Sequence, residues 1–358
     1  MQHAHLTYQL SAHPATARLS NSLITLLQTV HAQGSISKAA TVLGLSYRHV
    51  WGELKRWEKA LGEPLLHWER GQAAKLTAFG ERLLYADGLA QARLAPQIEA
   101  LQAELERSMA LAFDPQAQVL QLHASHDEAL SKLRVFAAAK KLHLDIHFTG
   151  SVDALRALNE GRCRMAGFHV RLPVATQGKS VQTYRCLLEP GQHKIIGFVQ
   201  RSQGLMVAKS NPLRIKNLRD VAEQQHRFVN RAAGTGTRLL LDDLLAELSL
   251  SGKDLLGYRH TEPSHQAAAL AVAQGAADCA LGIEAAAVAH GLGFIPQAKE
   301  RYALVVQRES LAEPATQALC KLLRSTAWLR KLEALAGYSA LDSGQVLRMT
   351  QVLPWWYF

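Results

Sequence analysis

The chain has 358 residues, of which 48% are hydrophobic and 20% are charged, and its formal net charge is +10. This composition is typical of a soluble globular protein, and the length favours two or three domains. The sequence has no apolar run long enough for a membrane helix and no secretory signal, which excludes a membrane-spanning or secreted protein. We therefore expect a cytoplasmic protein without a membrane partner, whose four scattered cysteines stay reduced.

Residues 34–71 hold the first strong pattern, which predicts a winged helix-turn-helix. Ser37 is expected to cap a short helix that ends at Gly44, whose backbone can take the positive φ of a turn. Ser46 is expected to cap the second helix, and Leu45 to fill the angle between the two helices. The inward face of the second helix is apolar and consists of Val50, Leu54 and Trp57.

The outward face of that second helix suits a major-groove reader, because Arg, His and Tyr side chains gather near its start. Two short strands within residues 64–76 are expected to form a wing whose basic tip contacts phosphates. The expected partner is a double-stranded DNA operator; a three-helix domain used for protein contacts is the alternative. The residues expected to contact DNA are Ser37, Ser46, Tyr47, Arg48, His49, Lys55, Arg56, Arg70 and Lys75.

A long helix is predicted over residues 77–112, and Pro96 should kink it or mark a change of packing partner. We expect two copies of the chain to pair along this helix, as a homodimer or a tetramer, because one winged domain rarely binds DNA tightly enough. Packing of the helix on its own domain is the alternative. The apolar repeat that favours pairing has heptad-like spacing and consists of Leu94, Ile98, Leu101 and Leu105.

The excess positive charge lies mainly outside the predicted DNA-binding domain. Residues 1–110 hold 11 basic and 9 acidic side chains, whereas residues 111–358 hold 29 and 21. DNA binding is therefore expected to need two copies of the first domain and to weaken as salt is added. The excess in the second part is compatible with an anionic ligand there, or with an ordinary solvated surface.

From residue 119 onward, short apolar runs alternate with helical stretches, which predicts mostly parallel sheets with helices on both faces. Two such lobes, with strands crossing between them, describe a bilobal binding domain whose ligand sits in the cleft. The predicted strands are 119–124, 144–148, 164–168, 194–200, 204–209, 227–230, 257–259, 278–283, 293–296 and 301–308. The predicted helices are 127–141, 152–160, 313–335 and three that begin at residues 237, 265 and 284.

Three loops that follow a strand and precede a helix are candidate ligand-binding segments. Open α/β sheets bind ligands at the ends of parallel strands, and helix starts with hydroxyls and free N–H groups suit an anion. Each loop alone is more often a simple cap, and the glycine-rich one is neither a Walker loop nor a dinucleotide fingerprint. The residues expected to bind the ligand are Ser125, His126, Thr149, Gly150, Ser151, Arg231, Gly234, Thr235, Gly236, Thr237, Arg238 and Ile283.

Two parts of the chain resemble known families. The first part of the chain resembles the DNA-binding domains of LysR-type regulators, and within that group it is closest to the molybdate-responsive ModE type. This resemblance rests on GSIS, AA, LG and S in that order, followed by a Trp-bearing helix, a wing and LTAFGERLL. Residues 119–349 resemble the periplasmic-binding-protein-like domains of molybdate-related regulators and molybdopterin-biosynthesis proteins. The segments VNRAAGTGTRLLLDDLL and GYSALDSGQV are among those that carry this second resemblance.

These resemblances imply an α/β chain in three parts. We expect a winged helix-turn-helix over residues 1–76, a linker and dimerisation helix over 77–116, and a bilobal type II periplasmic-binding-protein-like domain over 117–350. The first lobe would take about 117–198 and 302–350, and the second about 199–301. By position, Ser125 and Ser151 would be donors from the first lobe, and the loop from Arg231 to Arg238 would supply those of the second.

The favoured function is a transcription regulator that senses a small oxyanion, molybdate or tungstate, with no cofactor, catalytic residue or metal site. The same architecture sensing an organic anion, such as formate or a molybdopterin-like ligand, is the first alternative. A cofactor-biosynthesis enzyme fused to a DNA-binding domain is the second. We further expect His169 to be a packed histidine and the C-terminal PWWYF to be a strap on the second domain.

Overall fold

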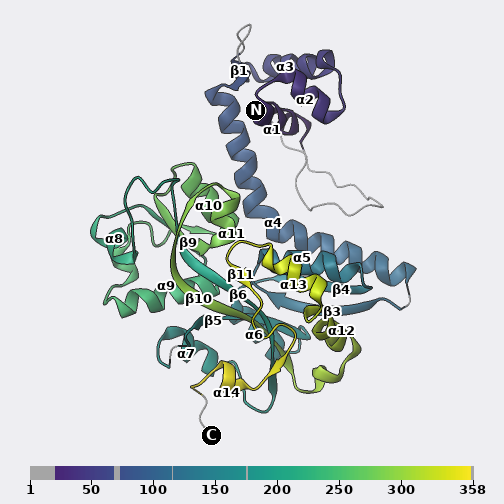
Figure 1. Cartoon of the computed structure of the whole chain (residues 1–358), viewed down its shortest axis with the longest axis vertical. Helices are drawn as coiled ribbons and strands as arrows, with labels where there is room; N and C mark the ends of the chain where they lie inside the picture. Colours follow the sequence, from purple (N-terminus) through teal and green to yellow (C-terminus); the bar gives the residue numbers. More distant parts are fainter. Residues whose placement is uncertain (1–20, 68–72, 115, 175, 356–358) are drawn as a thin grey trace. The chain divides into compact units, whose positions relative to one another are not determined.

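The computed structural model describes residues 21–67, 73–114, 116–174 and 176–355 (Figure 1). Contacts within the chain divide it into two units, Met1–Leu94 and Ala95–Phe358. The first unit has its own apolar core cluster, and three further clusters lie in the second. Across the described ranges, none of the helices combines the length and the apolar character that crossing a membrane requires.

The first unit contains the winged helix-turn-helix that the sequence predicts. Leu27, Val50 and Leu54 are almost completely buried at its centre. The two wing strands pair antiparallel, with Leu66 opposite Leu76. The elements are α1 (Ser22–Gln33), α2 (Ile36–Leu43), α3 (Tyr47–Leu61), β1 (Leu66–His67) and β2 (Lys75–Leu76).

The predicted cap of α2 is wrong. Ser35, not Ser37, is the N-cap, and its side chain accepts a hydrogen bond from the Lys38 amide at 3.4 Å. Ser37 lies inside the helix and is exposed. The helix starts two residues earlier than predicted, because Ile36 is buried in the core and belongs to the first turn.

The turn between α2 and α3 is confirmed in its backbone but not in its packing. Gly44 takes the left-handed conformation with φ of 67°, and Ser46 caps α3 by accepting from the His49 amide at 3.1 Å. Leu45 is 40% exposed and does not fill the angle between the helices. Its backbone amide instead donates to Ala40, which closes the last turn of α2.

The predicted long helix is α4 (Ala78–Phe113). Thr77 caps it, because its Oγ1 accepts from the Gly80 amide at 3.1 Å. Pro96 lies inside the helix without ending it. The boundary between the two units falls just before Pro96, so the helix changes its packing partner beside this residue.

A ten-stranded sheet forms the frame of the second unit (Figure 1). Its main order is β4-β3-β5-β10-β6-β9-β7-β8, and β11 and β12 pair with β6. Parallel pairs lie toward both ends, whereas β10 is antiparallel to β5 and β6. The strands are β3 (Gln118–Ala124), β4 (Leu142–Phe148), β5 (Met165–Leu172), β6 (His193–Val207), β7 (Phe228–Arg231), β8 (Thr261–Glu262), β9 (Cys279–Ile283), β10 (Gly293–Gln307), β11 (Tyr338–Ser339) and β12 (Val346–Leu347).

Helices cover both faces of this sheet, as predicted. Along β10, Tyr302 and Leu304 join one core cluster while Ala303 and Val305 join another, and alternate residues of a strand point to opposite faces. The helices of the second unit are α5 (Glu128–Ala138), α6 (Ser151–Asn159), α7 (Lys179–Arg185), α8 (Leu218–Glu223), α9 (Gly236–Glu247), α10 (His265–Ala273), α11 (Glu284–Ala289), α12 (Pro314–Leu323), α13 (Thr326–Glu333) and α14 (Met349–Val352).

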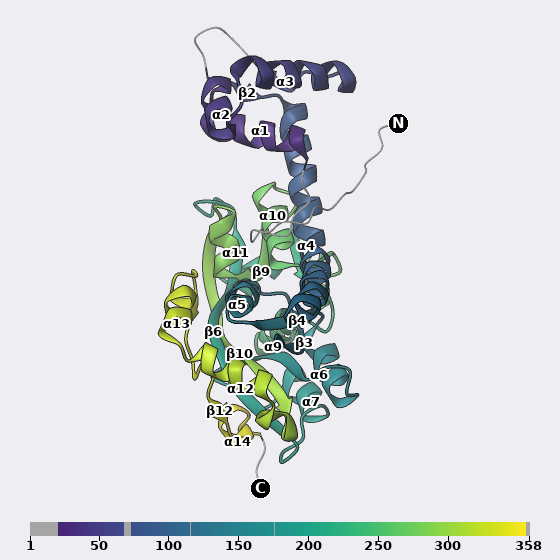
Figure 2. The same cartoon turned by 90° about the vertical axis from the view of Figure 1, so that its right-hand side faces the viewer.

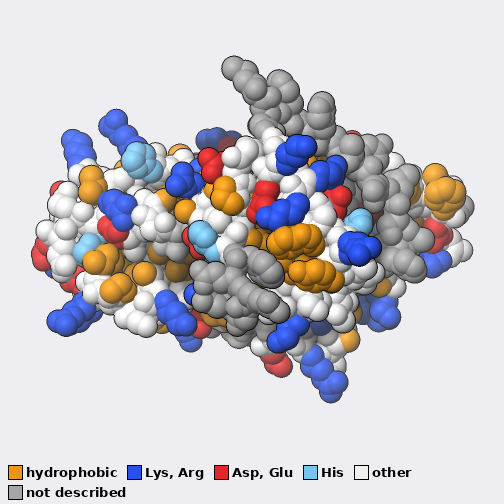
Figure 3. Space-filling view, turned by 90° about the horizontal axis from the view of Figure 1, so that it is seen from above, with side chains coloured by type: hydrophobic (Ala, Val, Ile, Leu, Met, Phe, Trp, Pro, Cys, Tyr) orange, Lys and Arg blue, Asp and Glu red, His pale blue; other side chains and the backbone are white. Residues whose placement is uncertain are grey.

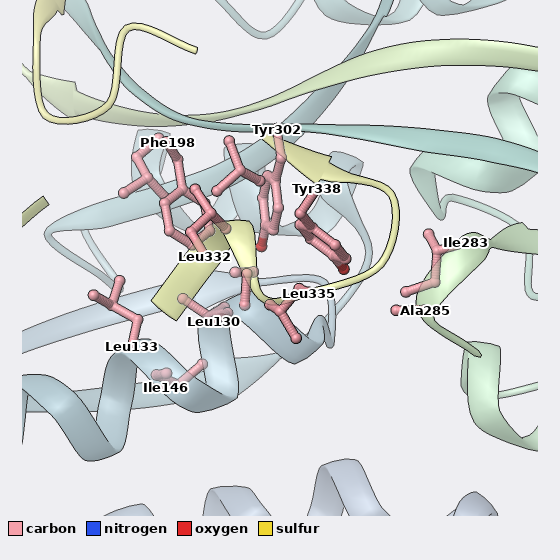
Figure 4. Close-up of a cluster of buried hydrophobic side chains, with 14 of the residues drawn as sticks. Leu130, Leu133, Ile146, Phe198, Ile283, Ala285, Tyr302, Leu332, Leu335 and Tyr338 are labelled. Atoms are coloured by element: carbon pink, nitrogen blue, oxygen red, sulfur yellow. The ribbon is translucent and has the colours of Figure 1, made fainter. Parts of the chain in front are cut away.

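The largest core cluster extends over both lobes of the second unit. Figure 4 shows Phe198 and Tyr302, from the crossing strands, next to Leu332 near the end of α13. Ile283 and Ala285, where β9 meets α11, belong to the same cluster. The two lobes therefore share one continuous apolar core at this face of the sheet.

The crossing strands are longer than predicted. Residues 194–200 and 204–209 are expected as separate strands, but β6 runs unbroken from His193 to Val207. In the same way β10 joins the predicted strands 293–296 and 301–308. Two of the charged residues that interrupt the apolar pattern are buried and paired with each other: Arg201 of β6 forms an ion pair with Glu300 of β10.

Two other element predictions are wrong. Residues 257–259 form turns instead of a strand, because Gly257 has φ of +93° and lies close against the Phe228 carbonyl. The single closing helix over 313–335 is two helices, α12 and α13, since Ser325 caps a new helix by accepting from the Trp328 amide at 3.3 Å.

The described part of the C-terminus packs on the second unit. Leu353 and Trp355 are buried in a core cluster, and the Trp355 carbonyl accepts a hydrogen bond from Arg185 at 3.1 Å. This agrees with the predicted strap. Residues 356–358 lie outside the described ranges.

The part of α4 that belongs to the second unit lies against α5 and β4 (Figures 1 and 2). Arg134 of α5 forms an ion pair with Glu106, and Asp145 of β4 pairs with Arg107 at 2.9 Å. Ala103 is buried by this contact. One face of the helix is therefore packed on its own unit.

Substitution of Ser35 and of Ser37 distinguishes the observed start of α2 from the predicted start. Ser35→Ala should lower the free energy of unfolding of the first unit by about 1 kcal/mol, because it removes the side-chain acceptor of the Lys38 amide. Ser37→Ala should be nearly neutral, since Ser37 is exposed inside the helix. Urea unfolding of both variants checks this, and a larger loss for Ser37→Ala would contradict the assignment.

Candidate functional site

The first turn of α3 is the best-formed candidate DNA interface. Tyr47, Arg48 and His49 are all exposed there, directly after the Ser46 cap. Tyr47 stacks on Trp51, with ring centroids 6.4 Å apart, which holds its ring along the helix. Side chains at the N-terminal end of a second helix are the ones that reach base edges in helix-turn-helix proteins.

The later basic residues of α3 are already engaged within the helix. Lys55 pairs with Glu58 at 2.7 Å and lies over the Trp51 ring, and Arg56 pairs with Glu53 at 2.5 Å. Such exposed pairs are weak and can exchange for phosphate contacts. Of the remaining predicted residues, Ser37 and Lys75 are exposed, and Arg70 lies outside the described residues.

Basic side chains are not gathered into one patch on the face drawn in Figure 3, where acidic groups lie between them. This fits the modest excess of basic over acidic residues in the first 110 residues. A single copy of these first 110 residues thus offers limited electrostatic attraction for DNA.

The second unit contains a buried polar centre on the face of the sheet where Tyr302 points. His169 of β5 lies opposite Tyr302 of β10, and their rings stack with centroids 4.0 Å apart. Arg201 and Gln203 of β6 lie beside them, two residues apart and so on one face of the strand. All four side chains are almost completely excluded from solvent.

Arg201 is the charged residue at the middle of this centre. Its guanidinium forms ion pairs with Asp127, the N-cap of α5, and with Glu300 of β10. Tyr338 donates to Asp127 at 2.6 Å. Burial alone would lower the pKa of Arg201, but the two carboxylates outweigh it and raise the pKa. This charge is therefore fully compensated within the protein.

Arg231, at the end of β7, is a second buried guanidinium with a different environment. It donates to the Glu262 and Pro263 carbonyls at 3.2 and 2.9 Å, and within the described residues it forms no ion pair with a carboxylate. Burial, followed by the nearby charge of Arg201, lowers the pKa of Arg231 to about 9. Its positive charge is thus buried without a compensating anion.

The predicted ligand loops meet at this centre. A Cβ on Gly150 would lie 2.7 Å from the Gly234 carbonyl, and one on Gly236 would lie 2.8 Å from His169. Only glycine permits such close approach of the loops. Ser151 Oγ lies 3.0 Å from His169 Nδ1, which joins the α6 loop to β5.

Thr237 and His265 complete the opposite side of the centre. Gln203 donates to Thr237 Oγ1 at 2.9 Å, and Thr237 Oγ1 lies 3.5 Å from His265 Nε2. Burial and then the neighbouring arginines lower the pKa values of His169 and His265 well below the usual range. Both rings are therefore neutral near pH 7, and each carries one N–H.

Five buried polar atoms around this centre have no hydrogen-bond partner in the described structure. When Ser151 donates to one ring nitrogen of His169, and Thr237 donates to one ring nitrogen of His265, the other nitrogen of each neutral ring carries the N–H. Four of the five atoms are then donors, and the fifth, Gln203 Oε1, is an acceptor. The atoms are Ser125 Oγ, His169 Nε2, Gln203 Oε1, Arg231 Nη1 and His265 Nδ1.

The other predicted ligand residues have partners of their own. His126 lies against Glu99, with 3.3 Å between its Nε2 and Oε1. Thr235 caps α9, and Arg238 lies over the Tyr258 ring and near Asp242. The Thr149 amide donates to the Ala124 carbonyl, and Ile283 is buried at the end of β9. Ligand binding by these residues stays a prediction.

Several residues of the centre escape the sequence analysis because they lie inside strands or helices instead of in loops. The one available signal is a charged or amide residue between two apolar runs, as at Arg201 and Gln203. These residues are Arg201, Gln203, His265, Glu300 and Tyr302. In the described part of the chain, no group of three or more His, Cys, Asp or Glu side chains is placed to hold a metal ion.

The neutral state of the buried histidines predicts how stability depends on pH. Their pKa values are lower in the folded than in the unfolded chain, so the unfolded chain binds more protons below about pH 6.5. The free energy of unfolding should fall as the pH drops below 6.5, by up to about 1.4 kcal/mol per pH unit for each of the two histidines. His169→Phe, which keeps a ring on Tyr302, should show a shallower fall in urea titrations at pH 5 to 8; an unchanged slope would contradict this.

Two family models match the chain. One is described as "PBP superfamily domain" and matches residues 134–324, more than half of the chain. The other is described as "Bacterial regulatory helix-turn-helix protein, lysR family" and matches residues 22–81.

Two known relatives each match part of the chain. "Uncharacterized protein YvgK" of Bacillus subtilis (strain 168) is 32% identical over 204 residues, which are 57% of this chain and 65% of that protein. The chain thus spans slightly less than two thirds of this relative. "Uncharacterized protein in ferredoxin 2Fe-2S gene 5'region" of Clostridium pasteurianum is 34% identical over 110 residues, 30% of this chain and 97% of the relative.

Among solved structures, the chain is similar to HinK, a LysR family transcriptional regulator from Pseudomonas aeruginosa. The identity is 15%, the match covers 85% of this chain and 98% of that one, and the TM-score is 0.41. On the family models, the chain belongs to the DNA-binding transcriptional regulators that join a lysR-family helix-turn-helix to a PBP superfamily domain.

Proposed function

We propose that this regulator binds a small oxyanion, molybdate or tungstate, at the buried polar centre of its second unit and so changes its affinity for a DNA operator. The uncompensated charge of Arg231 is the observation that carries this proposal. A buried charge without a partner is costly, and an anion beside it would recover that cost.

The number of free donors favours a tetrahedral oxyanion over a planar carboxylate. Ser125, His169, Arg231 and His265 offer four free donor atoms, and a tetrahedral oxyanion presents four oxygens. Formate has only two. Gln203 Oε1 is an acceptor, which an anion that keeps a proton, such as hydrogen phosphate, would satisfy better than molybdate.

The close approach of the loops favours a small ligand over a pterin. Gly150 lies against the Gly234 carbonyl, and Gly236 lies against His169, so the loops leave little space between them. A cavity of about 540 Å³ lies elsewhere, lined among others by Arg171, Lys179 and Asp243. A molybdopterin-like ligand would need the loops to separate.

An exposed apolar stripe on α4 supports a homodimer. Leu101 is 55% exposed and Ile98 and Leu105 are half-buried, although the opposite face of the helix is packed on its own unit. Exposed apolar residues at heptad-like spacing are the seam by which two helices pair. Two copies would present two winged domains to one bipartite operator, and anion binding would act by favouring one dimer geometry.

The anion site is tested by Arg231→Gln. We expect this variant to bind molybdate or tungstate about 10- to 100-fold more weakly, because a hydrogen bond to a charged group contributes about 1.5–3 kcal/mol. Without anion it should unfold no more easily than the natural chain, since an uncompensated buried charge is removed. Isothermal titration with molybdate, tungstate, phosphate, formate and a pterin measures the affinities.

The matched control is Arg227→Gln, four residues earlier, where the side chain is 53% exposed and pairs with Asp278. It should bind the anion as the natural chain does. Equal affinity of the Arg231 and Arg227 variants would reject the site, and selective binding of formate or the pterin would replace the oxyanion by that organic ligand.

The dimer is tested by Leu101→Glu, which places a charge in the exposed stripe of α4. We expect the variant to sediment as a monomer and to bind a two-half-site operator at least 10-fold more weakly. Val288→Glu, at a side chain of α11 that is 59% exposed, is the control and should stay dimeric. Sedimentation that is unchanged in the Leu101 variant would show that α4 is not the contact.

A further inference from the structure

Three consecutive residues at the end of β3 contact three different parts of the second unit. Ser125 has a free buried hydroxyl at the proposed anion site. Asp127 caps α5 and holds Arg201. His126, between them, contacts Glu99 of α4. One short loop thus connects the anion site, the charged centre and the helix that continues into the DNA-binding unit.

The contact between His126 and Glu99 is well enclosed. The His126 ring packs edge-on against Phe148, with centroids 4.9 Å apart, and its Nε2 lies 3.3 Å from Glu99 Oε1. The other carboxylate oxygen of Glu99 accepts from Ser131 at 2.6 Å. Burial tends to raise the pKa of Glu99, but His126 and Ser131 outweigh it, so the pKa is lowered and the carboxylate stays ionised.

The other described polar contacts of this part of α4 involve residues outside the loop. Glu106 pairs with Arg134 of α5, which also reaches Gln102. Arg107 pairs with Asp145 of β4. Neither Arg134 nor Asp145 lies at the anion site. Among the described hydrogen bonds and ion pairs, the His126–Glu99 contact is therefore the one that joins the loop to α4.

We propose that His126 is a positioning residue that couples anion occupancy to α4 through Glu99, an inference that rests on the proposed function. An anion bonded to Ser125 restrains the short loop between β3 and α5, in which His126 is the next residue. The His126 ring then holds the Glu99 carboxylate, and this contact favours one of two positions of α4 along the rest of the second unit. Coupling of this kind requires that the anion favour one arrangement over the other.

The test compares coupling in matched variants. His126→Phe keeps the ring contact with Phe148 and removes the nitrogen that meets Glu99, and Glu99→Ala removes the carboxylate. Glu106→Ala is the control, since Glu106 lies seven residues along the same helix and contacts α5 without touching the loop. Ser131→Ala removes the other partner of Glu99 and leaves His126 in place.

For each full-length protein, molybdate affinity is measured by titration, and operator affinity by fluorescence anisotropy with and without saturating molybdate. The natural chain should change its operator affinity by about fivefold or more. Glu99→Ala should keep the anion affinity within about twofold while the operator response falls toward one. The operator response of His126→Phe should fall in the same way at a molybdate concentration that saturates that variant. Glu106→Ala and Ser131→Ala should respond as the natural chain does. A full response in His126→Phe and Glu99→Ala would overturn the proposal.

A second readout does not need the anion. Amide hydrogen exchange of residues 124–127 in the ligand-free protein should speed up in Glu99→Ala and stay unchanged in Glu106→Ala, if the loop is held by α4. Equal exchange in both variants would show that the His126–Glu99 contact does not hold the loop. A natural chain that binds no anion would instead reject the proposed function, while the exchange comparison still decides the contact.

Discussion

The structure of the second unit depends on two guanidinium groups buried within one polar centre. Arg201 is compensated by Asp127 and Glu300, which lie on either side of it. Among the described residues, the Arg231 side chain bonds to carbonyls and to no carboxylate, and burial followed by the charge of Arg201 lowers its pKa. A fold that keeps one buried charge balanced and another unbalanced holds a standing electrostatic preference for an anion, because removing a charge from water is expensive.

The polar centre lies where the two lobes meet, so an anion bound there can contact both of them. β6 and β10 run through both lobes, and they carry Arg201, Gln203 and Glu300 at the point of crossing. Loops from both lobes close over the same point, as the approach of Gly150 to Gly234 demonstrates. A ligand held there would touch both lobes at once, so its binding energy would be tied to their relative position.

The sequence predicted the fold far better than it predicted the centre of the site. Apolar periodicity and caps determine where helices and strands form, so the helix-turn-helix, α4 and the alternation of strands and helices could be read locally. The glycine-rich loop and Ser151 were also found locally, as turn and cap signals. Arg201 and Glu300 could not be found in this way, since each looks like a strand break until the partner 99 residues away is known. The loop that holds His126 was also identified locally, but the contact of His126 with Glu99 could not be, because it depends on how α4 packs.

The most direct measurement of the central claim is the anomalous difference density of tungsten in crystals of the full chain grown with tungstate. The account predicts a single strong peak in the second unit, surrounded by Ser125 Oγ, His169 Nε2, Arg231 Nη1 and His265 Nδ1, with the tungstate oxygens within hydrogen-bonding distance of these atoms. A peak elsewhere, or none at this centre under saturating tungstate, would contradict it.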